Sequence, residues 1–369
     1  MVTGTWPPLK CGVGDNVRRL CDALARLGMK LEVITSTGAA RTAPRGIRVH
    51  PIVRGWTVRA MGAVAGRIAA ADCDLVHLQY PTVAYGKRLG INWLPVLLRR
   101  RLSRLPVVTQ LHEFALFGRA GQWRLAPNIL LARRVCVTSG VERDTVVRRY
   151  PSVRGRIRVI PIGTSIGVTG TAAAGRRLLR RFGVGPGEQS LVYFGWAGPG
   201  KGLPILLDAM GRLRGAKVPV RLVAVAALVP SRDALHARLA AQTRSLGIGD
   251  AVRWTGYLPA RDVSSLLLAA RACVLPFDDG LKLNRSSFIA PLEHGVPVVT
   301  THGPGEREVA GAAVTFCDPD GASVARAVRA VLARPRPRRP VPPPAARRFG
   351  WDRIASAYVK VYREVAGGR

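Results

Sequence analysis

Short runs of β-branched residues alternate with longer amphipathic runs along almost the whole of this 369-residue chain. Strands and helices that alternate in this way form parallel sheets with right-handed crossover connections. The alternation stops at the Gly-rich stretch Gly163–Gly175 and then begins again. The pattern predicts an α/β protein with two doubly wound, Rossmann-like domains, residues 1–165 and 185–333, facing each other across a cleft. Such domains bind ligands at the carboxyl ends of their strands.

Each series contains six candidate strands, and a different kind of segment follows the second series. The candidates cover residues 31–35, 48–53, 75–79, 106–110, 134–139 and 157–162, then 190–195, 220–226, 251–256, 272–277, 297–301 and 313–317. The Pro/Arg-rich residues 333–348 cannot form the interior of a helix or sheet and predict an extended connector. A terminal helix, residues 350–369, follows this connector, which is long enough to let the helix pack outside the second domain.

The charge of the chain is unusual, because 57 basic residues face 22 acidic ones and give a net charge of +35. One interpretation is that the arginines lie on a solvated surface and reflect the codon usage of a GC-rich genome. The other is an anionic partner such as membrane lipid, nucleic acid or a phosphorylated substrate. No apolar run reaches about 18 residues, the N-terminus does not have the pattern of a signal peptide, and six scattered cysteines favour reduced thiols. We therefore expect a cytoplasmic protein.

Two motifs in the first half have residues suited to a sugar-phosphate ligand. In "PPLKCGVGDN", Gly12 and Gly14 would let a ligand approach the backbone, and the following helix offers N–H groups and a positive dipole end to phosphate. In "QLHEF", which follows a candidate strand, His112 would hydrogen-bond a sugar hydroxyl and Glu113 would orient it or accept a proton. The alternative for the glycine motif is a plain strand-to-helix turn, and the alternative for His112 is a structural histidine. His77, in the preceding strand, has the same alternative as His112.

Two motifs in the second half carry positive charge toward a helix start. "YFGWAGPGKG" ends a strand in a Gly-rich loop whose Lys201 would neutralise a diphosphate, although the loop is not a Walker A motif. Arg285 precedes a helix expected from about Phe288, with Ser286 or Ser287 as its N-cap. Free amides, a helix dipole and a guanidinium fork together favour a diphosphate site. The alternatives are a surface lysine in a loop and a solvated arginine.

Taken in order, these motifs resemble those of GT-B-fold, family-4-type glycosyltransferases (glycosyl transferases group 1). The shared set is CGVG, LHE, FG…GPGKG, RWTGYLP and EHGVPVV, and it ends with "RFGWDRIASAYVKVYREV", which resembles the family's C-terminal helix that crosses back to the first domain. Each motif alone is weak, but the set in this order is specific and covers nearly the whole chain. The resemblance implies the GT-B fold and a hexosyltransferase-like enzyme.

The resemblance also implies roles for individual residues. The backbone of the first glycine loop would approach the donor phosphate and the reacting sugar carbon, His112 would contact the donor sugar, and Glu113 joins it as a catalytic candidate. The donor-binding candidates come from three places: the first glycine loop, the motif YFGWAGPGKG, and the segment that would border the nucleotide base. They are Gly12, Val13, Gly14, Gly195, Lys201, Tyr257 and Leu258.

The chain departs from the family pattern at three positions. Trp196 stands where the family has an arginine that pairs with the loop lysine. The family also has two glutamates eight positions apart, of which the first holds the sugar and the second the ribose hydroxyls. Lys282 and Ala290 occupy these two positions here.

We interpret the departures as a rebuilt donor site. Lys201, Arg285 and the helix N-terminus keep the positive groups that a diphosphate needs, and Arg285 would replace the missing loop arginine. Glu293 would reach the ribose, although helical geometry turns it roughly 60° from the face of Ala290. Lys282, Ser286 and Ser287 also count among the donor-binding candidates, and Asp278 and Asp279 are further candidates for the sugar hydroxyls.

The expected reaction is transfer of a hexose-like sugar from a nucleoside diphosphate donor to the hydroxyl of a small-molecule, glycan or lipid-linked acceptor. The resemblance implies retention of the anomeric configuration and no essential metal or cofactor. Fixed positive groups would stabilise the leaving diphosphate instead. Asp72 and Asp74 have the spacing of a DxD metal motif but precede a strand. Nucleic acid is not an expected partner.

Two other classes of protein remain open: a catalytically silent sugar-nucleotide- or polyanion-binding protein on the same scaffold, and a sugar-nucleotide epimerase or sugar phosphorylase. Separately, the segment Lys87–Pro106 is basic and contains Trp93. It predicts that the protein associates peripherally with the anionic inner face of a membrane. Pro95 is expected to divide this segment into two short pieces. The alternative is a core helix with a solvated arginine end.

Overall fold

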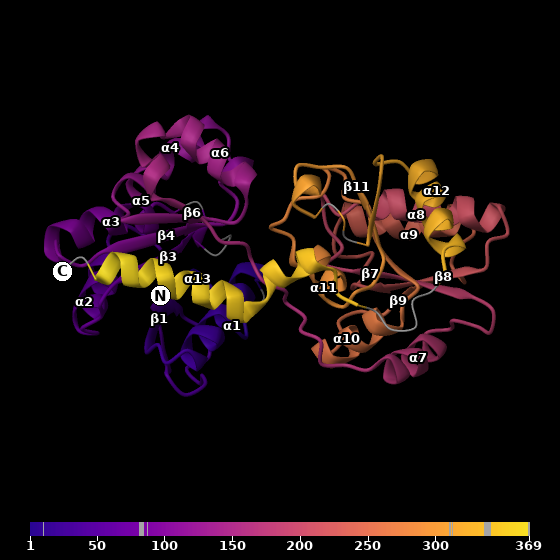
Figure 1. The fold of residues 1–369 in the computed structure, drawn as a ribbon, viewed down its shortest axis with the longest axis horizontal. Helices are drawn as coiled ribbons and strands as arrows, with labels where there is room; N and C mark the ends of the chain where they lie inside the picture. Colours follow the sequence, from indigo (N-terminus) through magenta and orange to yellow (C-terminus); the bar gives the residue numbers. More distant parts are fainter. Residues whose placement is uncertain are drawn as a thin grey trace. The chain divides into compact units, whose positions relative to one another are not determined.

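The structure is a computed structural model that describes residues 1–9, 11–80, 85–86, 88–309, 311, 313–335 and 341–367 (Figure 1). It contains two compact units, which are described separately. Unit 1 comprises Met1–Ser165 and Arg348–Arg369, and unit 2 comprises Ile166–Arg347. Each unit is built on a parallel sheet with helices, so the predicted α/β class with two Rossmann-like sheets is confirmed.

A short segment around Val2, which the sequence patterns did not predict, lies at the centre of the unit 1 sheet. Val2 bridges β1 and β3 by pairing with Ile34 on one side and Leu78 on the other. Its N–H donates to the His77 carbonyl (2.9 Å), and its carbonyl accepts from the Gln79 N–H (3.0 Å). The described pairings are parallel and join β1 (Leu31–Ser36), β2 (Ile47–Val53), β3 (Val76–Tyr80), β4 (Val107–Leu111), β5 (Arg134–Val137) and β6 (Ile157–Val159).

The strand order is therefore β2, β1, the Val2 segment, β3, β4, β5 and β6. The chain runs outward from the Val2 segment to β1 and β2 and then returns to β3 on its other side. Ligands of doubly wound sheets bind where the strand order reverses in this way. The loop that follows the Val2 segment leads into α1 (Gly12–Arg26), so it begins at this point of the fold.

Helices cover both faces of the unit 1 sheet. On one face, Leu20 and Leu24 of α1 share a core with Tyr358 and Tyr362 of α13 (Trp351–Ala366), so the terminal helix belongs to this unit (Figure 1). On the other face, buried side chains come from α2 (Met61–Ala69), α3 (Gly90–Arg101), α5 (Ala126–Leu130) and α6 (Gly140–Arg149). The short helix α4 (Arg119–Arg124) precedes α5.

The prediction that Pro95 divides its segment into two pieces is wrong, because α3 continues through it. Proline lacks the N–H that would bond the carbonyl four residues earlier, which here is that of Ile91. The Asn128 side-chain amide donates to this carbonyl instead, at 3.1 Å. A partner distant in sequence thus satisfies the carbonyl that the proline leaves without a helical donor.

Unit 2 has a sheet in the order β12-β11-β10-β7-β8-β9. The chain runs from β7 outward through β8 and β9, then crosses back to β10, so the strand order reverses between β7 and β10. The loops after these two strands meet at the carboxyl edge. The strands are β7 (Gln189–Phe194), β8 (Val220–Val225), β9 (Val252–Trp254), β10 (Ala272–Leu275), β11 (Val298–Thr301) and β12 (Val314–Cys317).

The helices of unit 2 begin within the stretch that predicted a linker. Gly175 of α7 packs so closely on α10 that an added Cβ would lie 1.9 Å from the Ser265 carbonyl oxygen. Most of Gly163–Gly175 therefore belongs to unit 2, which begins at Ile166 rather than at residue 185. The helices are α7 (Ala172–Arg181), α8 (Leu203–Gly215), α9 (Ala234–Ser245), α10 (Ala260–Ala269), α11 (Ser286–Glu293) and α12 (Gly321–Ala333). Among the helices of the described residues, none combines the length and apolarity needed to cross a bilayer.

Candidate functional site

The structure gathers two of the predicted phosphate-binding cations at the switch point of unit 2. Arg285 donates from Nη1 to the Gly200 carbonyl at 3.0 Å, which ties it to the Gly-rich loop after β7. Its guanidinium carbon lies 4.1 Å from the centre of the Phe277 ring, and Lys201 Nζ lies 5.6 Å from the same centre. Lys201 and Arg285 thus share one aromatic neighbour, although 84 positions separate them in the sequence.

Asp279 organises the cations of this cluster. Lys282 Nζ lies 2.6 Å from its Oδ2, and Arg285 Nη2 donates to its Oδ1. Burial acts to raise the pKa of Asp279, but the hydrogen bonds and charges of Lys282 and Arg285 outweigh burial and lower it. The carboxylate is therefore ionised at neutral pH and holds both cations, so a diphosphate that reached Arg285 would compete with Asp279 for it.

The start of α11 differs from the prediction, because Arg285 itself is the N-cap and Ser286 and Ser287 are the first helical residues. The amides of Phe288 and Ile289 donate to the Arg285 carbonyl, at 3.0 and 3.3 Å. The two amides before them lie outside the helix's own hydrogen bonds and are the ones that a bound anion would use. No serine side chain caps the helix, so both hydroxyls are outside the capping role that the sequence suggested.

The glycine loop touches this helix start. A Cβ added to Gly195 would lie 3.7 Å from Ser287 Cβ, so the end of β7 packs against the first turn of α11. Gly200 and Gly202 have φ angles of +74° and +65°. A Cβ on Gly202 would lie 1.5 Å from the Pro276 carbonyl oxygen, so only glycine lets the loop pass this close to the end of β10.

His236, which the sequence analysis missed, holds the loop from its other side. Its Nδ1 lies 3.0 Å from the Val229 N–H, and its Nε2 lies 3.1 Å from the Ala197 carbonyl. Because a backbone N–H can only donate, Nδ1 must be unprotonated and Nε2 must carry the proton. The ring is buried, and it links the loop to the β8–α9 connection. In the sequence it is one residue of an ordinary helical pattern, so no local signal marks it.

The positions that depart from the family pattern have distinct surroundings. The half-exposed Trp196 ring lies against Gly198, where an added Cβ would come within 2.0 Å of it. Ala290 is fully buried, and its carbonyl lies 2.7 Å from His294 Nδ1. Glu293 ends α11, about 10 Å along the helix axis from Ser286 at 1.5 Å per residue. Glu293 as a ribose contact therefore stays a prediction.

Tyr257 and Leu258, the predicted neighbours of the base, follow β9 at the carboxyl edge of the same sheet. The preceding Gly256 donates its N–H to the Ala226 carbonyl at 3.1 Å, so the segment lies beside the end of β8. Tyr257 is 69% exposed. This exposed ring lies at the edge where the sequence predicts the nucleotide base.

In unit 1, Gly12 and Val13 are the first residues of α1, and Cys11 is its N-cap. Gly14 is buried, and a Cβ there would lie 2.7 Å from Thr5 Oγ1 in the loop that leads to the helix. Gly12 is exposed, and apart from its chain neighbours and the backbone of its own helix, a Cβ there would meet nothing within 4 Å. The fold therefore requires Gly14 to be small, whereas it does not require this of Gly12.

This difference separates ligand contact from folding. We expect Gly12→Ala to leave the free energy of unfolding unchanged, yet to lower sugar transfer at least tenfold if the loop approaches the donor phosphate. Gly14→Ala should lower the free energy of unfolding by about 1–3 kcal/mol through overpacking. Denaturant unfolding and initial rates measure the two effects. Full transfer activity in Gly12→Ala would remove Gly12 from the site.

His112 and Glu113 follow β4 at the carboxyl edge of the unit 1 sheet. His112 is 5% exposed, and its Nε2 lies 2.9 Å from Gln79 Oε1 in β3. Burial lowers the pKa of His112 to about 4, so the ring is neutral at pH 7. Glu113 is exposed beside it. A neutral imidazole suits a hydrogen bond to a sugar hydroxyl better than it suits a charged contact.

Comparisons with known proteins match the two units separately. Residues 11–167 match the family model Glycosyltransferase Family 4, and residues 188–334 match the model Glycosyl transferases group 1. A D-inositol 3-phosphate glycosyltransferase from Kineococcus radiotolerans is 24% identical over 99% of this chain and 94% of its own length. One of the same description from Saccharomonospora viridis is 30% identical over 63% of this chain. The match spans only 56% of that relative's length.

Solved structures share the fold over the full chain. Sucrose-phosphate synthase from Thermosynechococcus elongatus superposes with a TM-score of 0.77 at 21% identity, covering 100% of this chain and 98% of its own. Anabaena HepE, crystallised with UDP and glucose, superposes with a TM-score of 0.71 at 17% identity, covering 100% and 97%. These likenesses support the GT-B architecture that the motif order implied.

Proposed function

The chain belongs to the glycosyltransferases of family 4 and group 1, and we propose that it transfers a sugar from a nucleoside diphosphate donor to an acceptor hydroxyl. The observation that carries the proposal is the cluster of Lys201, Arg285 and the α11 N-terminus at the switch point of unit 2. The cluster keeps the positive groups that a leaving diphosphate requires, even though Trp196, Lys282 and Ala290 replace family residues.

The donor site acts by fixed electrostatics. When the bond between the sugar and the diphosphate breaks, negative charge grows on the leaving group, and preorganised cations and amides stabilise it without reorganising. Lys201, Arg285 and the first amides of α11 supply these groups. We therefore propose a reaction that needs no essential metal. From the resemblance to the family we also propose that the reaction retains the anomeric configuration, with His112 holding the donor sugar and Glu113 beside it.

The relatives suggest which ligands to try first. HepE was crystallised with UDP, and the matched relatives are named for transfer to a phosphorylated inositol. We propose a nucleoside diphosphate sugar as donor and a phosphorylated polyol among the first acceptors. A thermal-shift panel of nucleoside diphosphates should select one base. Mass spectrometry with that donor, in the presence of a chelator, should detect a glycoside, and NMR should assign its anomeric configuration. A panel in which no nucleotide raises the melting temperature would contradict the donor site.

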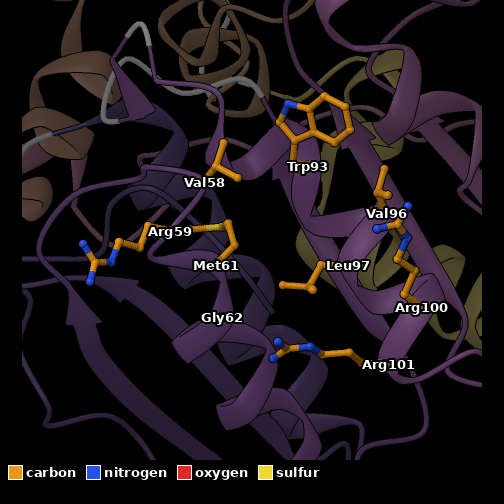
Figure 2. A pocket seen from close by; sticks show the side chains of 9 residues that line it. All are labelled: Val58, Arg59, Met61, Gly62, Trp93, Val96, Leu97, Arg100 and Arg101. Atoms are coloured by element: carbon orange, nitrogen blue, oxygen red, sulfur yellow. The ribbon is translucent and has the colours of Figure 1, made fainter.

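A groove on unit 1 supports the further proposal that the protein associates with an anionic membrane surface. The groove lies between α2 and α3 and has a volume of about 310 Å³. Apolar side chains and three arginines line it (Figure 2). Trp93 and Val58 are 48% and 53% exposed. Its lining residues are Val58, Arg59, Met61, Gly62, Trp93, Val96, Leu97, Arg100 and Arg101.

The two sequence stretches that form this groove have basic but no acidic residues, although one of the arginines, Arg67, pairs with Glu32 of β1 at 2.9 Å. Residues 54–70 contain three arginines and residues 88–106 contain five, and neither stretch contains Asp or Glu. Of the groove residues on α3, Trp93, Leu97 and Arg100 recur at helical spacing, so aromatic, aliphatic and cationic groups share one side of the helix. Lys87, the first residue of the predicted basic segment, lies outside the described residues. This face combines the apolar and cationic groups that bind an anionic lipid surface.

We expect Arg100→Ser/Arg101→Ser to weaken binding to vesicles that contain anionic lipid by roughly 30-fold, at about 1 kcal/mol for each arginine near the surface. Co-sedimentation at increasing salt measures the effect, which should shrink as salt rises. Arg176→Ser/Arg177→Ser, which removes the same charge from the exposed face of α7, is the matched control. Equal losses in both double variants, or equal binding to neutral vesicles, would contradict a membrane role for the groove.

A further inference from the structure

A chain of buried polar side chains connects the terminal helix of unit 1 to His112. Tyr362 Oη on α13 lies 2.6 Å from His77 Nδ1 on β3. His77 Nε2 lies 3.2 Å from the amide nitrogen of Gln79, and the amide oxygen of Gln79 lies 2.9 Å from His112 Nε2. Each of the four side chains is at most 5% exposed. In Figure 1, α13 lies across β3 and β4; His77 and Gln79 belong to β3, and His112 follows β4.

Gln79 fixes the polarity of this chain, because an amide has one end that donates and one that accepts. Its nitrogen lies 3.2 Å from His77 Nε2 and 3.5 Å from His77 Nδ1, and it also lies 3.8 Å from Met1 Sδ, which can only accept. Because Nε2 is the nearer ring nitrogen, it accepts from the amide, and the His77 proton lies on Nδ1, facing Tyr362 Oη. At the other end, His112 must carry its proton on Nε2, facing the amide oxygen of Gln79.

The tautomer of His112 is therefore linked to Tyr362 through Gln79 and His77. Burial lowers the pKa of both His77 and His112, so both rings are neutral at pH 7 and each has one donor and one acceptor nitrogen. With the proton on Nε2, Nδ1 of His112 is the nitrogen that accepts hydrogen bonds. If every hydrogen bond of this chain ran in the opposite direction, the His112 proton would lie on Nδ1. Nδ1 would then donate a hydrogen bond to the ligand instead of accepting one.

We propose that α13, through Tyr362, His77 and Gln79, fixes the tautomer and ring orientation of His112, which makes these three residues positioning residues for the sugar contact. The inference rests on the proposed function of His112, and it assigns the terminal helix a role beyond packing. In this tautomer Nδ1 is the nitrogen through which His112 would accept a hydrogen bond from a sugar hydroxyl. In this arrangement, α13 and the ends of β3 and β4 together hold His112 in place.

The chain offers a matched control one turn earlier on the same helix. Tyr358 is equally buried, but its hydroxyl donates to Gln110 Oε1, and Gln110 in turn donates to the Leu111 carbonyl at 3.0 Å. Tyr358 thus has no hydrogen bond to His77, although the two rings are in contact. Tyr362→Phe and Tyr358→Phe each remove one buried hydroxyl from α13, but only the first breaks the chain to His112.

Selective labelling tests the inference directly, because the chain has only six histidines. In protein labelled with [¹⁵N]histidine at pH 7, we expect the His112 signals to show a proton on Nε2, with assignment by His112→Asn. Tyr362→Phe should convert these signals to a tautomer mixture and lower kcat about tenfold with donor KM little changed. Tyr358→Phe should preserve the signals and change kcat less than twofold. Gln79→Met, which removes both amide contacts, should also release the tautomer.

An unchanged His112 tautomer in both Tyr362→Phe and Gln79→Met, or the same mixture in Tyr358→Phe, would overturn the inference. The NMR readout does not require turnover, so it is independent of the proposed function. A His112 tautomer that follows Tyr362 in a protein without transferase activity would support the hydrogen-bonded chain and contradict the proposed function.

Discussion

Lys201→Ala and Arg285→Ala should each weaken binding of the nucleoside diphosphate donor by about 10- to 150-fold, and the double variant should be weaker than either. Each change removes a charge-assisted hydrogen bond to the diphosphate, which contributes about 1.5–3 kcal/mol. The loss in Arg285→Ala should be the larger, because the side chain also ties the Gly200 loop to Asp279. Isothermal titration with the donor identified by the thermal-shift panel measures both losses.

Arg181→Ala is the control for this pair, since it removes an exposed cation from α7 in the same unit. Its donor affinity should equal that of the unaltered protein. Unchanged affinity in both Lys201→Ala and Arg285→Ala would remove the diphosphate from this cluster. A loss equal to theirs in Arg181→Ala would reduce the effect to the net charge of the unit.

Gly202→Ala should lower the free energy of unfolding by roughly 2–5 kcal/mol and abolish measurable donor binding. The positive φ of +65° costs an alanine about 1–2 kcal/mol, and the contact with the Pro276 carbonyl adds about 1–3 kcal/mol as the backbone shifts. The shift moves Lys201, the preceding residue, relative to Arg285. Denaturant unfolding together with donor titration measures both consequences.

Gly187→Ala separates the two causes. Gly187 has a φ of +80°, but a Cβ there would meet nothing within 4 Å, so only the backbone cost applies. This variant should lose about 1–2 kcal/mol and keep its donor affinity. Equal stability losses in Gly202→Ala and Gly187→Ala would show that the Pro276 contact does not constrain the loop.

The sequence predicted the strands well, because buried parallel strands are short β-branched runs that differ sharply from the amphipathic helices between them. It failed at the central position of the unit 1 sheet, because the paired segment around Val2 is too short to show any period. It also failed at Pro95, because the carbonyl of Ile91 is satisfied by Asn128, a partner whose position only the fold determines.

The sequence predicted those site residues that directly follow a strand. It did not predict contacts between side chains that lie far apart in the sequence. Gly-rich loops and Lys201 follow a strand end, so topology alone brings them to the carboxyl edge. The ion pairs of Asp279 and the bridging role of His236 depend on side chains from different loops and have no local signature. For the same reason Tyr362, 250 positions after His112, was not a candidate.

We expect the rebuilt donor site to support sugar transfer, because it keeps Lys201 and Arg285. The most direct measurement quantifies nucleoside diphosphate release and glycoside formation together, in the unaltered protein and in Lys201→Ala/Arg285→Ala, with a chelator present. We expect equal amounts of the two products from the unaltered protein and neither from the double variant. Donor binding without either product would identify a silent binding protein, and nucleoside diphosphate release without an acceptor would identify an epimerase-like or hydrolytic reaction. Either result would contradict sugar transfer to an acceptor hydroxyl.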